Sequence, residues 1–288
     1  MSTPSLLSKL RDLSLAVVDV ETTGASPRFG DGVTEVGIAR YEGGQLAGTY
    51  SELVRPTKPI PASIVALTGI TNAMVADQPS FAERLDDIVA SLRADIVIGH
   101  NVRFDLGFLA GEFRRAGTTL SNELGNPHVL DTVRIARRRF GRGGNGLQKL
   151  SRRLGVVPTD AHRALADAVT TGQVLEIMLE PLGGWDMSLI DVLSLQGGAM
   201  SLESKADQAE KDLPPELVRA MDLRQPVIMT YLDARRRETQ RRVDPLEIRS
   251  NHGVGTLIAW CHMRNDRRTF KLDRIVRVEV CVAESATD

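Results

Sequence analysis

The segment that most constrains the fold is a short apolar run that ends in two carboxylates. Residues 15–20 read Leu-Ala-Val-Val-Asp-Val, and Asp19 and Glu21 are separated by one residue. Such a run predicts a buried strand, and alternate side chains of a strand lie on the same face. We therefore expect both carboxylates to project in the same direction from the end of this strand. Taken alone, the pair is also compatible with a solvated turn.

The pattern of apolar residues predicts further strands and helices up to about residue 180. The expected strands are 33–41, 49–54, 96–99 and a short one at 129–130. The expected helices are 61–67, 81–92, 103–116, 132–139, 147–154 and 164–178. Strands that are followed by helices interleaved with a further strand describe an α/β layer architecture.

Two further motifs place carboxylates at the beginnings of expected helices. In Gly99-His-Asn-Val-Arg-Phe-Asp105 a strand ends, the chain turns and a helix begins, so Asp105 lies in the first helical turn. In His162-Arg-Ala-Leu-Ala-Asp167 the separation of five places His162 and Asp167 on different sides of a regular helix. We therefore expect His162 on the preceding loop. Taken singly, Asp105 could simply complement the helix dipole. His162 taken singly could be an ordinary surface residue.

Brought together, these carboxylates would repel one another unless cations compensated their charge. Hard oxygen ligands select Mg²⁺ or Mn²⁺ over zinc. Two such ions about 3.5–4 Å apart can clamp the attacking and leaving oxygens of a phosphoryl displacement. If the four carboxylates Asp19, Glu21, Asp105 and Asp167 cluster, we therefore expect them to do so around divalent cations.

The three motifs resemble those of the DEDDh 3′→5′ exonucleases, the family of the proofreading subunit of bacterial DNA polymerase III and of RNase T. The resemblance covers about residues 13–180 and implies a ribonuclease H-like fold, a mixed sheet flanked by helices. It implies that Asp19 bridges the two ions. Glu21 and Asp167 would complete one metal site, and Asp105 would support the other. His162 would be the general base that takes a proton from the metal-bound water, a role that suits an imidazole near neutral pH.

The same resemblance implies a substrate and a set of residues that contact it. The expected substrate is the 3′ end of DNA or RNA, and the expected products are nucleoside 5′-monophosphates. The candidate substrate-binding residues are Thr22, Thr23, Gly24, Leu67, Thr68, Asn101 and Phe104. The alternatives are a plain strand-to-loop turn at Thr23, a helix C-cap formed by Gly69, and core packing for Phe104. His100 is expected to be structural.

A basic stretch precedes the third motif. It comprises Arg137, Arg138, Arg139, Arg142, Lys149, Arg152 and Arg153. A solvated helix face explains such a stretch. The alternative is a track for a phosphate backbone, whose contribution to binding would weaken as the salt concentration rises.

The character of the chain changes after Pro181. Residues 183–213 are rich in glycine and polar residues, which predicts a linker. Beyond it, strands are expected at 227–232, 241–248, 255–262 and 274–282, which suggests a small barrel or sandwich. We therefore expect an exonuclease domain at residues 1–182 and a second domain at residues 214–288.

The C-terminal segment resembles a WYL domain over about residues 214–282, which implies a small SH3-like β-barrel. The resemblance includes Val227-Ile-Met-Thr-Tyr231 and Leu257-Ile-Ala-Trp-Cys261, and it departs at the tripeptide that names the family, where this chain has Gly255-Thr-Leu257. It implies a nucleotide or oligonucleotide ligand. The candidate contacts are Tyr231, Arg242, Trp260 and Arg268. Core packing of Trp260 and a solvated rim of arginines are the alternatives.

Composition excludes some classes of protein. The formal net charge of −1 argues against a protein that coats nucleic acid through bulk positive charge. No apolar run is long enough to span a membrane and no signal-type segment is present, so we expect a cytoplasmic protein. Cys261 and Cys281 fit packed thiols, with a single disulfide as the alternative.

Two other function classes are open at this point. One is a ligand-sensing regulatory protein with a vestigial nuclease, although a vestigial site usually loses a carboxylate and none is lost here. The other is a proofreading subunit that acts only within a polymerase, although the expected C-terminal barrel differs from the tether of such subunits. DNA or RNA preference, single strand or duplex end, and oligomeric state are not decided by the sequence.

Overall fold

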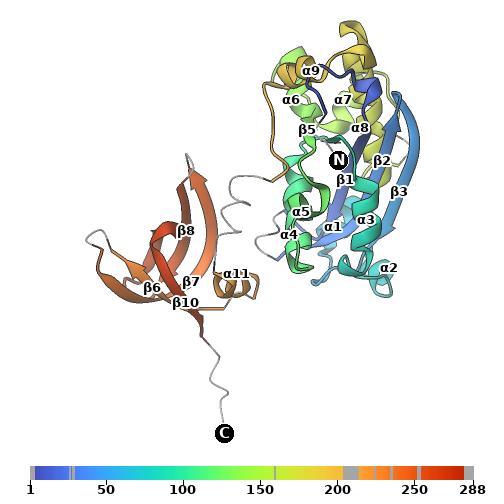
Figure 1. Cartoon of the computed structure of the whole chain (residues 1–288). Coiled ribbons are helices and arrows are strands. Elements are labelled where there is room, and N and C mark those ends of the chain that lie inside the picture. Colours follow the sequence, from blue (N-terminus) through green and yellow to red (C-terminus); the bar gives the residue numbers. More distant parts are fainter. Residues whose placement is uncertain are drawn as a thin grey trace. The chain divides into compact units, whose positions relative to one another are not determined.

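The computed structural model describes residues 4–25, 27, 30–158, 160–203, 214–223, 225–233, 236–251 and 254–281. The chain divides into two compact units, which are described separately (Figure 1). The first unit is built from residues 1–27 and 31–202, and the second mainly from residues 203–288.

The first unit contains a five-stranded mixed sheet in the order β3-β2-β1-β4-β5. Its strands are β1 (Leu15–Thr22), β2 (Val33–Glu42), β3 (Gln45–Leu53), β4 (Ile96–Gly99) and β5 (His128–Asp131). The first three strands pair antiparallel, whereas β4 pairs parallel to both β1 and β5. Because helices cover both faces of this sheet, the predicted α/β layer architecture is confirmed.

Helices occupy most of the remaining residues of the first unit. The α-helices are α1 (Ala62–Thr68), α2 (Asn72–Val75), α3 (Leu85–Leu92), α4 (Arg103–Arg115), α5 (Leu120–Leu124), α6 (Thr132–Phe140), α7 (Leu147–Arg153), α8 (Ala164–Leu179) and α9 (Leu189–Gln196). The 3₁₀ helices are η1 (Leu10–Asp12), η3 (Ala82–Arg84), η4 (Glu180–Leu182) and η5 (Gly184–Asp186).

The alternation of side chains along β1 separates two apolar cores. Val18 and Val20 pack with α3 and α4 on one face of the sheet. Leu15 and Val17 pack with α6, α8 and α9 on the other face. Because Asp19 continues the series of Leu15 and Val17, it projects toward the α8 face.

Small residues allow α8 to lie close against β2. A β-carbon on Gly37 of β2 would lie 2.2 Å from the backbone of Ala164, and one on Gly172 of α8 would lie 2.2 Å from the hydroxyl of Tyr41. Neither approach is compatible with a larger side chain. The N-terminal end of α8 is therefore held against the strand that neighbours β1.

The N-terminal part of the expected linker is folded onto the first unit. Leu189 and Val192 of α9 are fully buried in the core beneath α8. The side chain of Gln196 accepts a hydrogen bond from the backbone N–H of Asp131 and donates one to the carbonyl of Val129, both at 2.9 Å. Two of the glycines that suggested a linker serve as helix caps instead: Gly197 ends α9 in the left-handed conformation, and Gly183 lies between η4 and η5. Residues 204–213 of the expected linker lie outside the described residues.

The second unit is an antiparallel sheet in the order β10-β6-β7-β8-β9, and its described residues also form a short α-helix and a 3₁₀ helix. Its elements are α11 (Pro215–Asp222), β6 (Val227–Leu232), β7 (Glu238–Asn251), β8 (Val254–Cys261), β9 (Asp266–Lys271), η6 (Leu272–Arg274) and β10 (Ile275–Val280). Leu217 and Ala220 of α11 pack into the buried face of the sheet. Within the described residues no ladder joins β9 to β10, so a closed barrel is not found.

Within the described ranges, no helix has the length and apolar character needed to cross a membrane. Cys261 and Cys281 are both free thiols.

Candidate active site

The first two carboxylates lie side by side along one face of β1. Val18 and Val20 are buried, whereas Asp19 and Glu21 are partly exposed, as expected for alternate positions of a strand. In the antiparallel pairing with β2, Asp19 lies opposite Gly37 and Glu21 lies opposite Glu35. The expectation that both carboxylates project in one direction is confirmed.

The second motif brings its carboxylate to the same strand. Asp105 lies in the first turn of α4, as expected, and only 3% of it is exposed. Its Oδ1 accepts a hydrogen bond of 3.1 Å from the backbone N–H of Val20, the residue between Asp19 and Glu21. Asp105 is therefore tied to the acidic end of β1, and a role limited to the helix dipole does not account for this contact.

The third motif supplies a histidine and a fourth carboxylate. His162 precedes α8, and Asp167 lies in the first turn of that helix. The backbone N–H of His162 donates to Oδ2 of Asp167 at 3.3 Å, and Nε2 of Gln148 donates to Oδ1 at 3.1 Å. The expected loop position of His162 is confirmed, and its φ of 65° lies in the left-handed region.

The motifs converge in space. One ligand atom from each of Glu21, His162 and Asp167 lies within 4.8 Å of the other two. Such a group of oxygen and nitrogen atoms could hold a metal ion. Side chains that are more than 140 positions apart in the sequence thus meet at one point.

The carboxylates perturb one another strongly. Burial, together with the charges of Asp105 and Asp167, raises the pKa of Asp19 well above its ordinary value. Burial and the charges of Asp167 and Glu35 raise the pKa of Glu21 to about 8. Burial raises the pKa of Asp105 to about 8, although its hydrogen bond from Val20 acts in the opposite direction. The cluster therefore favours either bound protons or bound cations.

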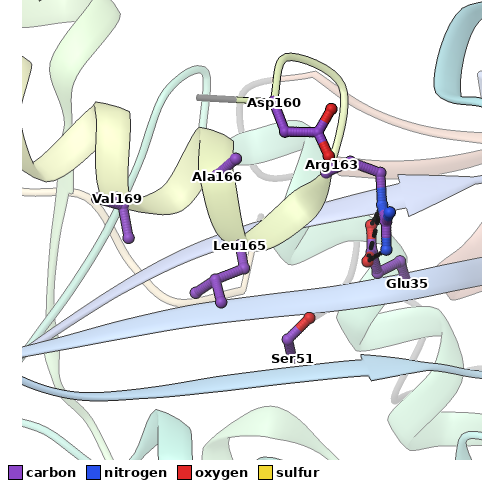
Figure 2. Close-up of a pocket in the computed structure, with 7 residues that line it drawn as sticks. All are labelled: Glu35, Ser51, Asp160, Arg163, Leu165, Ala166 and Val169. Atoms are coloured by element: carbon purple, nitrogen blue, oxygen red, sulfur yellow. Dashed lines mark hydrogen bonds and ion pairs between the residues drawn. The ribbon is translucent and has the colours of Figure 1, made fainter. Parts of the chain in front are cut away.

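An ion pair between buried Glu35 and partly exposed Arg163 fixes the third motif, and the sequence did not predict it. Glu35 of β2 is 1% exposed, and its carboxylate accepts hydrogen bonds from Nε and from one terminal nitrogen of Arg163 at 3.1 and 2.6 Å. It also accepts a bond of 2.9 Å from the backbone N–H of Ala164, at the beginning of α8. Figure 2 shows Glu35 and Arg163 facing each other beside a pocket of about 340 Å³ that Leu165 and Val169 also line. A charged residue within the apolar strand at residues 33–41 was the one available signal.

Two further contacts, which the sequence did not predict, join α7 to the third motif and the loop before α7 to the second motif. Gln148, which bonds Asp167, carries no motif of its own. His100 makes hydrogen bonds of 2.8 Å with Thr132 and with the carbonyl of Asn145, and burial lowers its pKa. His100 is therefore a structural residue that ties two loops together.

The candidate substrate residues differ in their accessibility. The hydroxyl of buried Thr22 donates to the carbonyl of Gly24 at 2.7 Å, and that of buried Thr23 accepts from the N–H of Gly32 at 3.0 Å. Both hydroxyls thus serve the loop after β1. A β-carbon on Gly24 would lie 2.3 Å from the carboxylate of Asp31, so a larger residue there would force the Asp31 side chain to move.

Two apolar candidates remain open to solvent. Leu67 is 54% exposed at the end of α1, whereas Thr68 is buried and Gly69 forms the expected left-handed C-cap. Phe104 is 38% exposed, and its ring centroid lies 4.9 Å from that of the core residue Phe108, so the side chain is partly packed on the core and partly open to solvent. Asn101 is exposed at a φ of 68°.

The four candidates in the second unit do not converge. The register pairs Arg268 with Ala259, which is buried, and Trp260 with Arg267, which is exposed. Tyr231 contacts the ring of Phe270 on the buried side, and its hydroxyl accepts from the N–H of Lys271 at 3.1 Å. Alternation places Arg242 and Trp260 on the face opposite to Tyr231 and Arg268.

Comparison with known proteins bears on both units. A model of the exonuclease family matches residues 16–175, and a model of the WYL domain matches residues 213–280. The sequence is 38% identical to the 3′-5′ exonuclease DinG of Bacillus subtilis over 167 residues, which are 58% of this chain and 18% of that protein. It is 38% identical to a DNA polymerase III subunit epsilon-like protein of Rhodobacter capsulatus over 178 residues, 60% of this chain and 25% of that protein. The chain therefore spans less than a third of the length of either relative.

Solved structures share the fold. Exonuclease X, in complex with 5′-overhanging duplex DNA, superimposes with a TM-score of 0.50 at 24% identity and covers 64% of this chain and 99% of its own. Exonuclease I superimposes with a TM-score of 0.55 at 16% identity, covering 86% of this chain and 55% of its own. At these identities the likeness concerns the fold alone, and it confirms the expected ribonuclease H-like architecture.

Proposed function

We propose a function for this chain from the fact that it belongs to the exonuclease family, whose model matches more than half of its residues. The chain is a 3′→5′ exonuclease that hydrolyses the terminal phosphodiester bond of a nucleic-acid strand and releases a nucleoside 5′-monophosphate. The observation that carries this proposal is the convergence of Glu21, His162 and Asp167 within 4.8 Å, next to Asp19 and Asp105.

The family implies a dependence on divalent metal, and the donor set fits such ions. The carboxylates are crowded enough to raise their own pKa values, so cations would relieve a repulsion that is built into the fold. Oxygen donors favour Mg²⁺ or Mn²⁺, and two ions suit this chemistry. Asp19, Glu21, Asp105 and Asp167 would hold them. Bound cations would neutralise charge on the phosphate and promote ionisation of the attacking water.

His162 is the proposed general base. It would take a proton from the attacking water while the bond between phosphorus and the 3′ oxygen breaks, and the departing oxygen would gain a proton from solvent. Its backbone is fixed by the bond to Asp167 and by the neighbouring Arg163–Glu35 ion pair. This attachment would hold the imidazole at one position relative to the carboxylates.

The exposure of two apolar candidates supports contact with the end of a strand. Leu67 and Phe104 offer apolar surface on which a terminal base could stack. Thr22, Thr23 and Gly24 would shape the loop under the terminal nucleotide, Thr68 would hold the end of α1, and Asn101 would offer a polar contact. These roles extend the proposal from the chemistry to the substrate.

The second unit is proposed to bind or sense nucleic acid or a nucleotide. The match to the WYL domain suggests such a module, and Arg242 and Trp260 share one sheet face that combines charge with an aromatic ring. Arg268, which is exposed on the other face, would make a separate contact, whereas Tyr231 packs against Phe270 on that face and would support the sheet. A second candidate function is a role in association with a polymerase, because one relative is named a DNA polymerase III subunit epsilon-like protein. Co-purification of this chain with a replicative polymerase would support that function.

Digestion of matched oligonucleotides tests the proposed function. DNA and RNA strands, labelled at either end, are incubated with Mn²⁺ or with EDTA. The proposal predicts that a label at the 3′ end is released at once as a mononucleotide. A strand that carries its label at the 5′ end should shorten stepwise. Both reactions should occur only when metal is present. Release of a 5′ label first, or products that end in a 3′ phosphate, would reject it.

A further inference from the structure

The chain between Asp131 and Asp160 is basic throughout. Its 28 residues contain eight lysines and arginines and no aspartate or glutamate. Six of the basic side chains are exposed, and we call them the basic surface: Arg137, Arg138, Arg142, Lys149, Arg152 and Arg153. Within the described part of the chain, none of the six forms an ion pair with a carboxylate. This concentration contrasts with a net charge of −1 for the whole chain.

The basic surface is attached to the active site at two points. Gln148 of α7 donates to the carboxylate of Asp167 at 3.1 Å. The loop between α6 and α7 is held by the bond of 2.8 Å between the carbonyl of Asn145 and the ring of His100 in the second motif. The guanidinium of Arg153 lies 4.4 Å from the centre of the Phe140 ring, which joins the ends of α6 and α7.

Helix-dipole effects do not explain the whole pattern. Basic residues are favoured in the last turn of a helix, where Arg137 and Arg138 of α6 and Arg152 and Arg153 of α7 lie. Arg142 lies in the loop and Lys149 lies before the last turn of α7. A dipole effect also gives no reason for the absence of acidic residues over the entire stretch.

We propose that the basic surface binds the phosphate backbone of the substrate strand and guides its 3′ end into the acidic site. This inference rests on the proposed function, because it names the path that the substrate takes to that site. Without bound cations the carboxylate cluster repels a polyanion, and a nearby attractive surface would keep the strand in place whether or not the cations are bound. At 1.5 Å per residue the nine residues of α6 extend over about 13 Å, the length of about four nucleotides in one strand of a duplex. The surface thus acts on strands and not on single nucleotides.

Two matched double variants test this inference. Arg137→Ala/Lys149→Ala removes two charges from the basic surface, and alanine preserves helix formation. Lys9→Ala/Arg11→Ala removes two charges elsewhere in the first unit, where both side chains pair with Asp186. Binding of a single-stranded oligonucleotide is measured by fluorescence anisotropy in EDTA, so that hydrolysis does not interfere. If the first variant loses its helical circular dichroism signal, the same binding measurement is made on Arg142→Ala, which changes a residue in the loop.

The expected result is weaker and less salt-dependent binding by the first variant. Each phosphate contact that the variant loses should reduce the affinity about fivefold near 0.1 M salt. Each lost contact should also make the plot of log affinity against log salt concentration shallower, by about 0.7 in slope for single strands. The control variant should match the wild type. The first variant should also lose kcat/KM for an oligonucleotide more than it loses kcat/KM for the p-nitrophenyl ester of thymidine 5′-monophosphate. The ester is too short to reach α6 and α7.

The outcomes separate this inference from the proposed function. Equal losses of binding in the two double variants, with an unchanged salt slope, would overturn the role of the basic surface. A wild type that hydrolyses neither the ester nor the oligonucleotide would reject the proposed function, and the anisotropy data would still decide whether the basic surface binds nucleic acid.

Discussion

His162 adopts a backbone conformation, with φ at 65°, that residues with a β-carbon rarely adopt. Asparagine tolerates this conformation better than most residues but cannot act as a base near neutral pH. We therefore expect His162→Asn to fold as stably as the wild type and to lose about 10²- to 10⁴-fold in kcat. His162→Ala should lose the same activity and also some stability. Thermal unfolding and single-turnover hydrolysis measure the two effects, and an Asn variant with wild-type kcat would exclude the general base.

Glu21 links stability to pH and to metal. Its pKa is about 8 in the fold, above its ordinary value of 4.5, so the metal-free protein loses stability as the pH rises through this window. We expect the Tm in EDTA to fall between about pH 5.5 and about pH 8.5, and to fall less in Glu21→Gln. Added Mn²⁺ should raise the Tm more at the higher pH, because carboxylates bind metal only after losing their protons. A larger effect of Mn²⁺ at the lower pH would contradict this linkage.

For individual residues, the sequence predicted the motif side chains but not the residues that bind them in place. Asp19, Glu21, Asp105, His162 and Asp167 could be predicted because strand alternation and helix starts follow from local spacing. Glu35 and Gln148 could not, because their contacts depend on how α7 and α8 pack on the sheet. Arg163 stands inside a motif, yet its partner is 128 positions away.

At the scale of elements, the close approach of α8 to β2 positions the third motif. A β-carbon on Gly37 would lie 2.2 Å from the backbone of Ala164, and backbone cannot move aside cheaply. We expect Gly37→Ala to destabilise the protein by about 1–3 kcal/mol and to reduce activity, because Ala164 adjoins His162 and Asp167. Gly48→Ala on β3 is the matched control, since a β-carbon at that position would have no neighbour within 4 Å. Denaturant unfolding and kcat distinguish the two variants, and equal effects would remove the packing explanation.

Element prediction succeeded where one face of each element is apolar. The strands at 15–22 and 96–99 and the helices that carry Asp105 and Asp167 were expected close to their observed positions. Helix α9 was missed because the glycines around it suggested a linker, whereas they serve as caps. In the second unit α11 was missed, and the closure of the sheet into a barrel depends on long-range pairing that spacing does not specify.

At the scale of the whole molecule, the two units have separate cores. The apolar residues of the second core all lie between Leu217 and Val280, whereas those of the first unit end at Leu202. We expect a chain of residues 1–203 to fold and to hydrolyse the mononucleotide ester. A chain of residues 1–182 should fold poorly, because it lacks Leu189, Val192 and the side chain of Gln196 that bonds β5. Circular dichroism and thermal unfolding compare the two chains, and equal stability would show that α9 is dispensable.

The overall architecture was predictable to the level of its two parts. The order of strands and helices indicated an α/β unit followed by a β-rich one, and the mixed sheet is confirmed. Spacing could not predict which sheet face each candidate residue of the second unit occupies, because the faces of different strands are matched only by the register of their pairing, such as Asp244 opposite Trp260. Arg242 and Trp260 therefore could not be separated in advance from Tyr231 and Arg268.

The central claim is that the converged carboxylates perform metal-dependent hydrolysis at a 3′ end, and Asp19→Asn tests it most directly. This substitution preserves shape and removes one charge from a crowded anionic cluster, so the variant should be at least as stable as the wild type in EDTA. Mononucleotide release from an oligonucleotide in Mn²⁺ is the measurement. We predict a loss of at least about 100-fold, as expected for removal of one preorganised electrostatic group. Wild-type release by a folded Asp19→Asn protein would contradict the account.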